Sequence, residues 1–283
     1  MDSLVPLTIS DEEFELIRRL IHGALGINLT SDKRSLVAGR LNFFLREKGY
    51  SDFHAYHEGI RKDTTGMELS ELADRITTNH TFFNREKDHF DFLTRVVLPE
   101  ITAEKRRRGS RSLKIWCAAS STGEEPYMLG MLIMEYLSLD YKNWDAGLLA
   151  TDISDRALQE ARLGVYNEEK IRNLPQALVA RYFRKGPDGN YHAQSRLKEE
   201  ITFRRFNLIT PEYPFRSGFD VIFCRNVMIY FDTPTKDTLV QKMYQFTNPG
   251  GYFFVGHSES LDRKTCPYQF VRPAIYRKEP INA

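Results

Sequence analysis

Residues 116–130 read WCAASSTGEEPYMLG, and this stretch decides which fold the sequence predicts. An apolar run ends in small residues, turns at Gly123 and continues as a helical pattern, as strand–turn–helix crossovers of nucleotide-binding sheets do. A dinucleotide-binding turn would read G-x-G-x-x-G, because its glycines let a pyrophosphate reach the helix N-terminus. Here the turn has one glycine and two acids, Glu124 and Glu125, which would repel a pyrophosphate. They either suit a cationic ligand or only complement the helix dipole, for about 0.3–1 kcal/mol each.

Outward from this turn, the second half of the chain alternates apolar runs with helical patterns. The apolar runs predict strands at 113–119, 146–152, 218–226 and from Tyr252 on, with a weaker strand pair or hairpin at 270–278. The helical patterns cover 125–138, 154–164 and 234–247, the last stopped by NPGG. Such alternation requires right-handed crossovers, so it predicts an α/β fold: a doubly wound, mainly parallel sheet with helices on both faces.

Residues 1–78 predict helices only, so we expect an all-helical N-terminal domain. Ser10 and the acids after it fit the cap and first turn of a helix reaching Gly26. Ser31 and Asp32 open a second helix with five apolar residues on one side: Leu36, Val37, Leu41, Phe44 and Leu45. Two more helices are predicted at 53–62 and 67–77.

Two stretches fit neither pattern. ITTNHTFFNRE (76–86) has no simple amphipathic stripe, and its polar residues either fold over a site as a lid or pack between domains. The residues concerned are Asn79, Thr81 and Arg85. Residues 186–206 hold a PDGN turn between polar arms, which predicts a hairpin and a small β-subdomain at about 185–205.

The composition excludes several classes of protein. The 283 residues are 41% hydrophobic and 28% charged, and 40 Lys and Arg against 38 Asp and Glu give a net charge of +2, without the basic excess typical of nucleic-acid binders. Three separated cysteines, Cys117, Cys224 and Cys266, indicate neither a disulfide framework nor a zinc site, and free thiols fit a reducing cytoplasm. We expect no signal peptide and no membrane span.

Polar residues follow the predicted strands at the edge where doubly wound sheets bind ligands. Asp152 can accept hydrogen bonds from both ribose hydroxyls of an adenosine or, with Ser154, cap the next helix. Arg225 and Asn226 can hold the amino-acid portion of a cofactor, while Tyr230 lies either at the reacting centre or in the core. With the acids of the first turn, these residues are compatible with S-adenosylmethionine, whose ammonium and sulfonium groups are cationic.

In their order along the chain, six motifs resemble one family, the chemotaxis receptor glutamate methyltransferases (the CheR family): TTNHTFFNRE, CAASSTGEEPY, ATDIS, FNL (206–208), FCRNVMIYF and GHSESL. The resemblance implies a helical N-terminal domain (1–78), a linker and lid segment (79–112) and a class I S-adenosylmethionine-dependent methyltransferase domain (113–283) with an inserted β-subdomain. The implied reaction esterifies glutamate side chains on cytoplasmic chemoreceptor helices, for adaptation in chemotaxis. S-adenosyl-L-homocysteine is the implied product.

The resemblance also implies site residues, by motif position. The cofactor contacts would be Asn79, Thr81, Arg85, Glu125, Asp152, Asn207, Leu208, Arg225 and Asn226. Glu125 is preferred to Glu124, although the motif alone does not separate the two. Arg85 and Tyr230 match positions proposed to flank the methyl-transfer centre. No metal is expected.

The implied partner is the cytoplasmic domain of a chemoreceptor. Members that grip a receptor's C-terminal tail peptide have a longer, glycine-richer segment after the RYF match (181–183), so we expect this chain to recognise the receptor helix directly. A basic helix surface is implied to face that acidic helix, and it comprises Lys33, Arg34, Arg40, Arg46 and Lys48. A solvated helix face is the alternative.

The predicted chemistry needs little from the protein beyond alignment. A glutamate side chain has a pKa of about 4.3 in water, so it is ionised at neutral pH and needs no general base. Two rival functions remain: a methyltransferase of this fold acting on another acceptor, and a nonenzymatic adaptor that retained the fold. A nucleic-acid acceptor is disfavoured, because no aromatic-basic stacking platform is evident.

Overall fold

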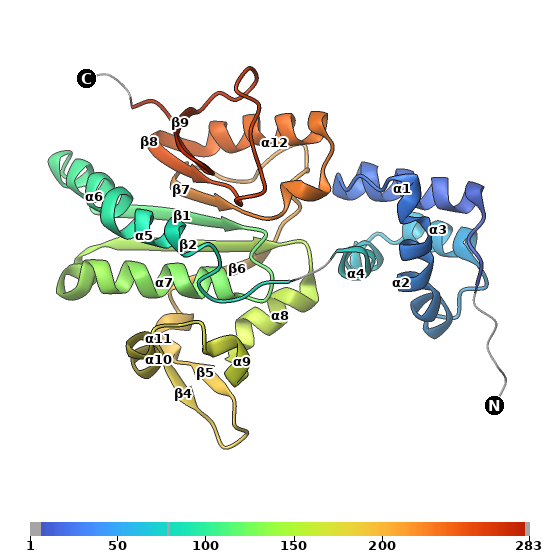
Figure 1. Ribbon diagram of the computed structural model, residues 1–283, viewed down its shortest axis with the longest axis horizontal. Coiled ribbons are helices and arrows are strands. Elements are labelled where there is room, and N and C mark those ends of the chain that lie inside the picture. Colours follow the sequence, from blue (N-terminus) through green and yellow to red (C-terminus); the bar gives the residue numbers. More distant parts are fainter. Residues whose placement is uncertain (1–6, 78–79, 281–283) are drawn as a thin grey trace. The chain divides into compact units, whose positions relative to one another are not determined.

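The computed structural model describes residues 7–77 and 80–280, which form two compact units (Figure 1). The first unit comprises residues up to Thr78 together with Tyr230–Thr235, and the second comprises Asn79–Ile229 and the chain from Lys236 on. Within the described residues, no helix combines the length and the apolar character that a membrane crossing requires.

The first unit is helical, as predicted. Its elements are α1 (Asp11–Leu25), the 3-10 helix η1 (Ser31–Lys33), α2 (Arg34–Glu47), α3 (Phe53–Lys62) and α4 (Met67–Ile76). Ser10 caps α1 reciprocally: its hydroxyl accepts from the Glu13 amide (3.2 Å), and its own amide donates to the Glu13 carboxylate (2.8 Å). On α2 the prediction for Leu36 is wrong, because its side chain is 39% exposed at the border of the buried stripe that Val37 begins.

A short segment from far along the chain completes this unit. Ile27 pairs with Phe231 in an antiparallel bridge, and the Asn28 amide donates to the Tyr230 carbonyl at 2.8 Å. His22 Nε2 lies 2.9 Å from the Asp232 carboxylate. The helical unit is therefore discontinuous in sequence, which the helical patterns of residues 1–78 do not reveal.

The second unit contains the predicted parallel sheet, with the strand order β6-β2-β1-β7-β8-β10-β9. Its strands are β1 (Ser112–Ala118), β2 (Asp145–Asp152), β6 (Ile201–Arg205), β7 (Phe219–Cys224), β8 (Thr247–Phe254), β9 (Gln269–Arg272) and β10 (Ile275–Arg277). The strands from β6 to β8 pair in parallel, whereas β10 is antiparallel to both β8 and β9. The predicted α/β fold is thus confirmed, although β8 already begins at Thr247 and includes the NPGG turn.

Helices cover the sheet. They are α5 (Lys87–Phe92), the π-helix η2 (Leu93–Val97), α6 (Leu98–Arg107), α7 (Glu124–Leu137), α8 (Asp155–Leu163) and α12 (Thr233–Phe246), with the 3-10 helices η3 (Ser138–Asn143) and η4 (Met228–Tyr230). The crossovers through α7 and α8 run from β1 toward β6, whereas the one through α12 runs the opposite way, from β7 to β8. Right-handed connections therefore place α12 on the face opposite α7 and α8.

The stretch between the helical patterns and the first strand, residues 79–112, is largely helical. Phe90 on α5, Leu93 on η2 and Ile101 on α6 belong to the same buried cluster as the sheet residue Phe223. Most of this stretch is therefore part of the packed core, and the residues before Lys87 remain as the loop that approaches the strand ends.

The β-subdomain differs from its prediction. A small sheet of order β3-β5-β4 is formed by β3 (Val165–Tyr166), β4 (Phe183–Lys185) and β5 (Tyr191–Ala193), beside α9 (Glu168–Ile171), α10 (Gln176–Tyr182) and α11 (Ser195–Lys198) (Figure 1). Residues 201–205, expected in the second hairpin arm, instead form β6 and pair in parallel with β2. Ile201 and Phe203 alternate with exposed residues, which suits an edge strand with one buried face.

Candidate functional site

The functional site is built at the carboxyl ends of β1, β2 and β7. In the sheet register, Ala118 at the end of β1 pairs with Thr151 of β2 on one side and with Cys224 of β7 on the other. The residues that follow these positions therefore meet at one edge of the sheet. Asp152 and Arg225 are brought together there with the turn after β1, as the sequence predicts.

The turn after β1 has an unusual backbone. Ala119 and Ser121 have φ values of 60° and 48°, and Gly123 has 98°. Left-handed conformations cost a non-glycine residue about 1–2 kcal/mol and cluster at ligand sites. The hydroxyls of Ser120 and Ser121 are buried, and neither has a hydrogen-bond partner within residues 7–77 and 80–280. This turn thus retains unused hydrogen-bonding capacity, as a polar ligand requires.

The structure distinguishes the two glutamates of the turn. Glu124 is fully buried, where its carboxylate accepts from Lys170 Nζ (2.6 Å) and from the Thr122 hydroxyl (2.7 Å). The Glu125 side chain retains 16% exposure, accepts from the Cys117 thiol (3.2 Å) and pairs with the Arg225 guanidinium (2.6 Å). Glu124 is therefore committed to a structural ion pair, and Glu125 is the acid that lies among the strand ends.

Asp152 joins two turns. One carboxylate oxygen accepts from the Ser121 amide (2.8 Å) and the other from the Ser154 amide (2.9 Å). The Ser154 hydroxyl caps α8 by accepting from the Ala157 amide (2.9 Å). The capping role that competed with a ligand role thus falls to Ser154, while Asp152 holds the loops after β1 and β2 together.

Arg225 is an almost fully enclosed charge, with 1% of its side chain exposed. Its guanidinium donates to Glu125 (2.6 Å), to Glu86 (2.8 Å) and to the Arg85 carbonyl (2.7 Å). It also lies 5.4 Å from the centroid of the Phe90 ring. Arg225 therefore fastens the segment before α5 to the strand ends.

Glu86 is a site residue that the sequence analysis missed. Burial alone would raise the pKa of its carboxyl, but the Arg225 charge and hydrogen bonds from Arg225 and Asn226 outweigh burial and lower the pKa to about 2. The Asn226 amide group donates to Glu86 at 3.2 Å. Glu86 directly follows Arg85 in the quoted NRE motif, and this position could have identified Glu86 as a site residue.

Asn226 turns the chain away from β7 in a left-handed conformation, with φ of 59°. Its main-chain amide donates to the Glu259 carboxylate at 2.8 Å. Asn207 and Leu208 follow β6, and the preceding residue, Phe206, donates its amide to the Asp152 carbonyl at 2.9 Å. Both predicted pairs are thus held at the same edge as Asp152.

The described residues give no contact that tests the predicted roles of four site residues: Asn79, Thr81, Arg85 and Tyr230. Asn79 lies outside the described residues, and Thr81 is half-buried. The Arg85 guanidinium donates to the His80 carbonyl (2.9 Å) and lies 5.8 Å from the centroid of the Phe82 ring. Tyr230 belongs to the helical unit. The roles given to these residues stay predictions.

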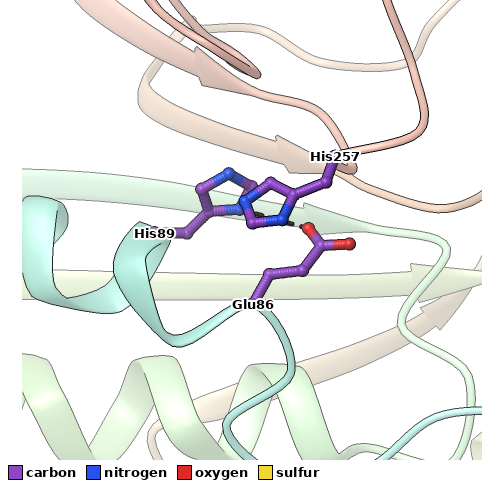
Figure 2. A group of neighbouring side chains, drawn as sticks. All are labelled: Glu86, His89 and His257. Atoms are coloured by element: carbon purple, nitrogen blue, oxygen red, sulfur yellow. Dashed lines mark ion pairs between the residues drawn. The ribbon is translucent and has the colours of Figure 1, made fainter.

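One set of side chains has the composition of a metal site. Glu86, His89 and His257 each place one ligand atom within 4.8 Å of the others, and Figure 2 shows the two imidazoles beside the carboxylate. Burial, followed by the Arg225 charge, lowers the pKa of the fully buried His89 to about 4, so its ring is neutral at pH 7. Neutral imidazole and carboxylate are zinc ligands. Glu86, however, already pairs with Arg225 at 2.8 Å.

Comparisons with known proteins agree with this geometry. The family model described as "CheR methyltransferase, all-alpha domain" matches residues 12–77, and "CheR methyltransferase, SAM binding domain" matches residues 79–276. The chain is 38% identical over 272 residues to a "Chemotaxis protein methyltransferase" of Borreliella burgdorferi, covering 96% of each protein. It is 35% identical over 258 residues to one of Escherichia coli, covering 90% of this chain and 86% of that protein.

The lowered pKa of Glu86 predicts a pH-dependent contribution to stability. A carboxyl with a pKa of about 2 in the fold and about 4.5 when unfolded stabilises the protein fully above pH 4.5, and this stabilisation is lost as the pH falls toward 2. We expect Glu86→Gln to lower the free energy of unfolding at pH 6 by about 1–3 kcal/mol. Between pH 6 and pH 3.5, the free energy of unfolding should then fall less in Glu86→Gln than in the wild type.

Urea unfolding at the two pH values measures both effects. Glu169→Gln is the matched control, because the Glu169 side chain is 77% exposed, and it should keep the wild-type pH dependence. Equal losses between pH 6 and pH 3.5 in Glu86→Gln and wild type would show that the Arg225 pair does not hold Glu86 ionised.

Proposed function

This chain belongs to the CheR methyltransferase family, and we propose that it is a protein-glutamate O-methyltransferase that esterifies glutamate side chains on cytoplasmic chemoreceptor helices. Glu125 carries the proposal, because it places an acid among the strand ends where a nucleotide-phosphate site would keep bare amide groups. This environment suits a positively charged methyl donor. The family relationship and the named relatives support chemotaxis as the process.

The residues present fit S-adenosyl-L-methionine. When bound, this cofactor supplies an electrophilic methyl group on a positively charged sulfur. Asp152 would hold the ribose, the Ser120 and Ser121 hydroxyls offer further hydrogen bonds, and Glu125 would favour the cationic end. Asn79, Thr81, Asn207, Leu208, Arg225 and Asn226 would complete the cofactor contacts.

Arg225 would act in this site mainly through its neighbours. Its guanidinium is occupied by two carboxylates and the Arg85 carbonyl, so it fixes Glu125 and the Arg85 main chain. Any contact of Arg225 with the cofactor then falls to its main chain. The Arg85 guanidinium donates one hydrogen bond to the His80 carbonyl, and its further N–H donors would serve the acceptor.

The proposed role of Arg85 is to orient the incoming glutamate carboxylate by charge-assisted hydrogen bonds. The acceptor is ionised at neutral pH, and its attack on the methyl carbon joins opposite charges into neutral products. Excluding water therefore helps, and alignment is the main remaining requirement. Tyr230, which follows Asn226 in the FCRNVMIYF motif, is proposed as the second residue of the methyl-transfer centre.

Receptor recognition is proposed to proceed without a tail peptide, through α2 and in the cytoplasm. Part of the basic set on this helix has partners within the unit: Arg34 donates to the Ile9 carbonyl (3.2 Å), and Lys48 pairs with Glu71 (2.6 Å). Lys33, in η1, also pairs with Asp32 (3.7 Å), so Arg46 is then the cation of this set best suited to meet an acidic helix.

One assay separates this function from its rivals. The protein is incubated with methyl-labelled S-adenosyl-L-methionine and membranes that contain the cognate receptor. Glutamate methyl esters release the label as methanol in mild base, which is the expected result. Base-stable label on a protein would indicate another acceptor, and cofactor binding without transfer would indicate an adaptor.

Arg85→Ala is expected to lower kcat/KM for the receptor about 10–100-fold, since the acceptor loses a charge-assisted hydrogen bond. Affinity for S-adenosyl-L-homocysteine should change less. Arg172→Ala is a suitable control, because the Arg172 side chain is 71% exposed. Unchanged turnover in Arg85→Ala would remove this residue from the mechanism.

The reaction is proposed to need no metal, because the methyl group is already activated by the sulfonium. Treatment with EDTA followed by gel filtration should leave the Tm and the affinity for S-adenosyl-L-homocysteine unchanged. A fall in either, reversed by Zn²⁺ in the wild type but not in His257→Ala, would instead assign a metal to Glu86, His89 and His257.

A further inference from the structure

Glu259 is a buried carboxylate between two loops at the strand ends, and the residue is 7% exposed. One carboxylate oxygen accepts from the main-chain amides of Asn226 (2.8 Å) and Gly256 (2.6 Å). The other accepts from the Ile229 amide (3.2 Å). Beyond the ends of β7 and β8, where the strand pairing stops, the Glu259 side chain thus links the two loops by hydrogen bonds to their main-chain amides.

The two loops approach closely at this point. A Cβ atom on Gly256 would lie 2.4 Å from the Asn226 side-chain nitrogen and 2.9 Å from the Glu259 carboxylate. A side chain at position 256 would therefore displace the Asn226 and Glu259 side chains.

The turn that Glu259 holds is the one with a left-handed residue. Asn226 has φ of 59°, which asparagine tolerates better than most residues but does not prefer. An ionised carboxylate accepts main-chain amides strongly, so it selects the conformation in which these amides converge. The same turn positions the Asn226 side chain on Glu86 and follows Arg225 directly.

The next residues of the loop after β8 reach the other side of the site. His257 Nε2 lies 3.2 Å from the Asp88 carboxylate, and its ring centroid lies 4.6 Å from that of His89 (Figure 2). Residues 256–259 therefore contact both α5 and the turn after β7, the two segments that Arg225 also joins.

We infer that Glu259 is a positioning residue of the cofactor site: it fixes the Arg225–Ile229 turn in its binding conformation before the cofactor arrives. The inference rests on the proposed cofactor contacts of Arg225 and Asn226. Glu259 acts through this turn, by three main-chain hydrogen bonds.

Glu259→Gln tests the inference with little change of shape, because one acceptor oxygen becomes a donor that faces other donors. We expect the Kd of S-adenosyl-L-homocysteine, measured by calorimetry without any receptor, to rise about tenfold or more. In turnover, KM for the methyl donor should rise more than kcat falls. Glu212→Gln makes the same chemical change at an exposed position and should leave both values unchanged.

A merely structural carboxylate would give another result. Its loss would lower the Tm and leave the Kd of the folded protein at the wild-type value, and this outcome would overturn the inference. Gly256→Ala, whose added Cβ would displace the Asn226 and Glu259 side chains, should reproduce the weaker binding.

Hydrogen exchange in the wild-type protein without cofactor tests whether the turn is fixed, even when both variants fail to fold. The amides of Asn226, Ile229 and Gly256 should be protected, whereas rapid exchange at all three would overturn the inference. A wild-type protein that binds no S-adenosyl-L-homocysteine but protects these amides would refute the proposed cofactor site and leave the fixed turn established.

Discussion

The buried ion pairs of Arg225 are the interaction on which the site depends. A guanidinium with 1% exposure loses almost all of its hydration, and two carboxylates and a carbonyl replace it. Removing one partner from such a pair is destabilising, because the other charge stays buried. Arg225 directly follows β7, and its three partners come from two other segments: the loop before α5 and the start of α7. The position of the loop before α5 at the strand ends therefore follows from one electrostatic requirement.

Backbone strain gathers around the same interaction. Asn84 and Glu86 before α5, Ala119 and Ser121 after β1, and Asn226 after β7 all have positive φ values between 48° and 62°. Each conformation is unfavourable by itself, so surrounding contacts must impose it. Arg225, Asp152 and Glu259 supply those contacts from side chains to neighbouring loops. The site is thereby shaped before it binds anything, which is the condition for precise alignment of a methyl donor and an acceptor.

The sequence predicts those features that local pattern controls. Ser10 predicts the start of α1, because it is a favoured N-cap residue. The runs that form β1, β2 and β7 are apolar enough to be predicted as buried strands. Strand β6 is not predicted as part of the main sheet, because the charged residues of ITFRR fit a polar hairpin arm equally well. Glu124 and Glu125 look alike in sequence, but a rotation of about 100° per residue sends one into the core and the other toward Arg225. The pairing of Arg225 with Glu86 spans 139 residues, and no local periodicity reports such a contact.

The bridge between Ile27 and Phe231 limits how the two units could be recombined with those of other proteins during evolution. Because Tyr230–Thr235 belongs to the helical unit, the polypeptide passes between the units three times instead of once. A fragment ending at residue 78 would leave Ile27 and Asn28 without their main-chain partners. The two units are consequently poor candidates for separate exchange between proteins. A hybrid of two relatives that exchanges the helical unit would need to exchange residues 1–78 and 230–235 together.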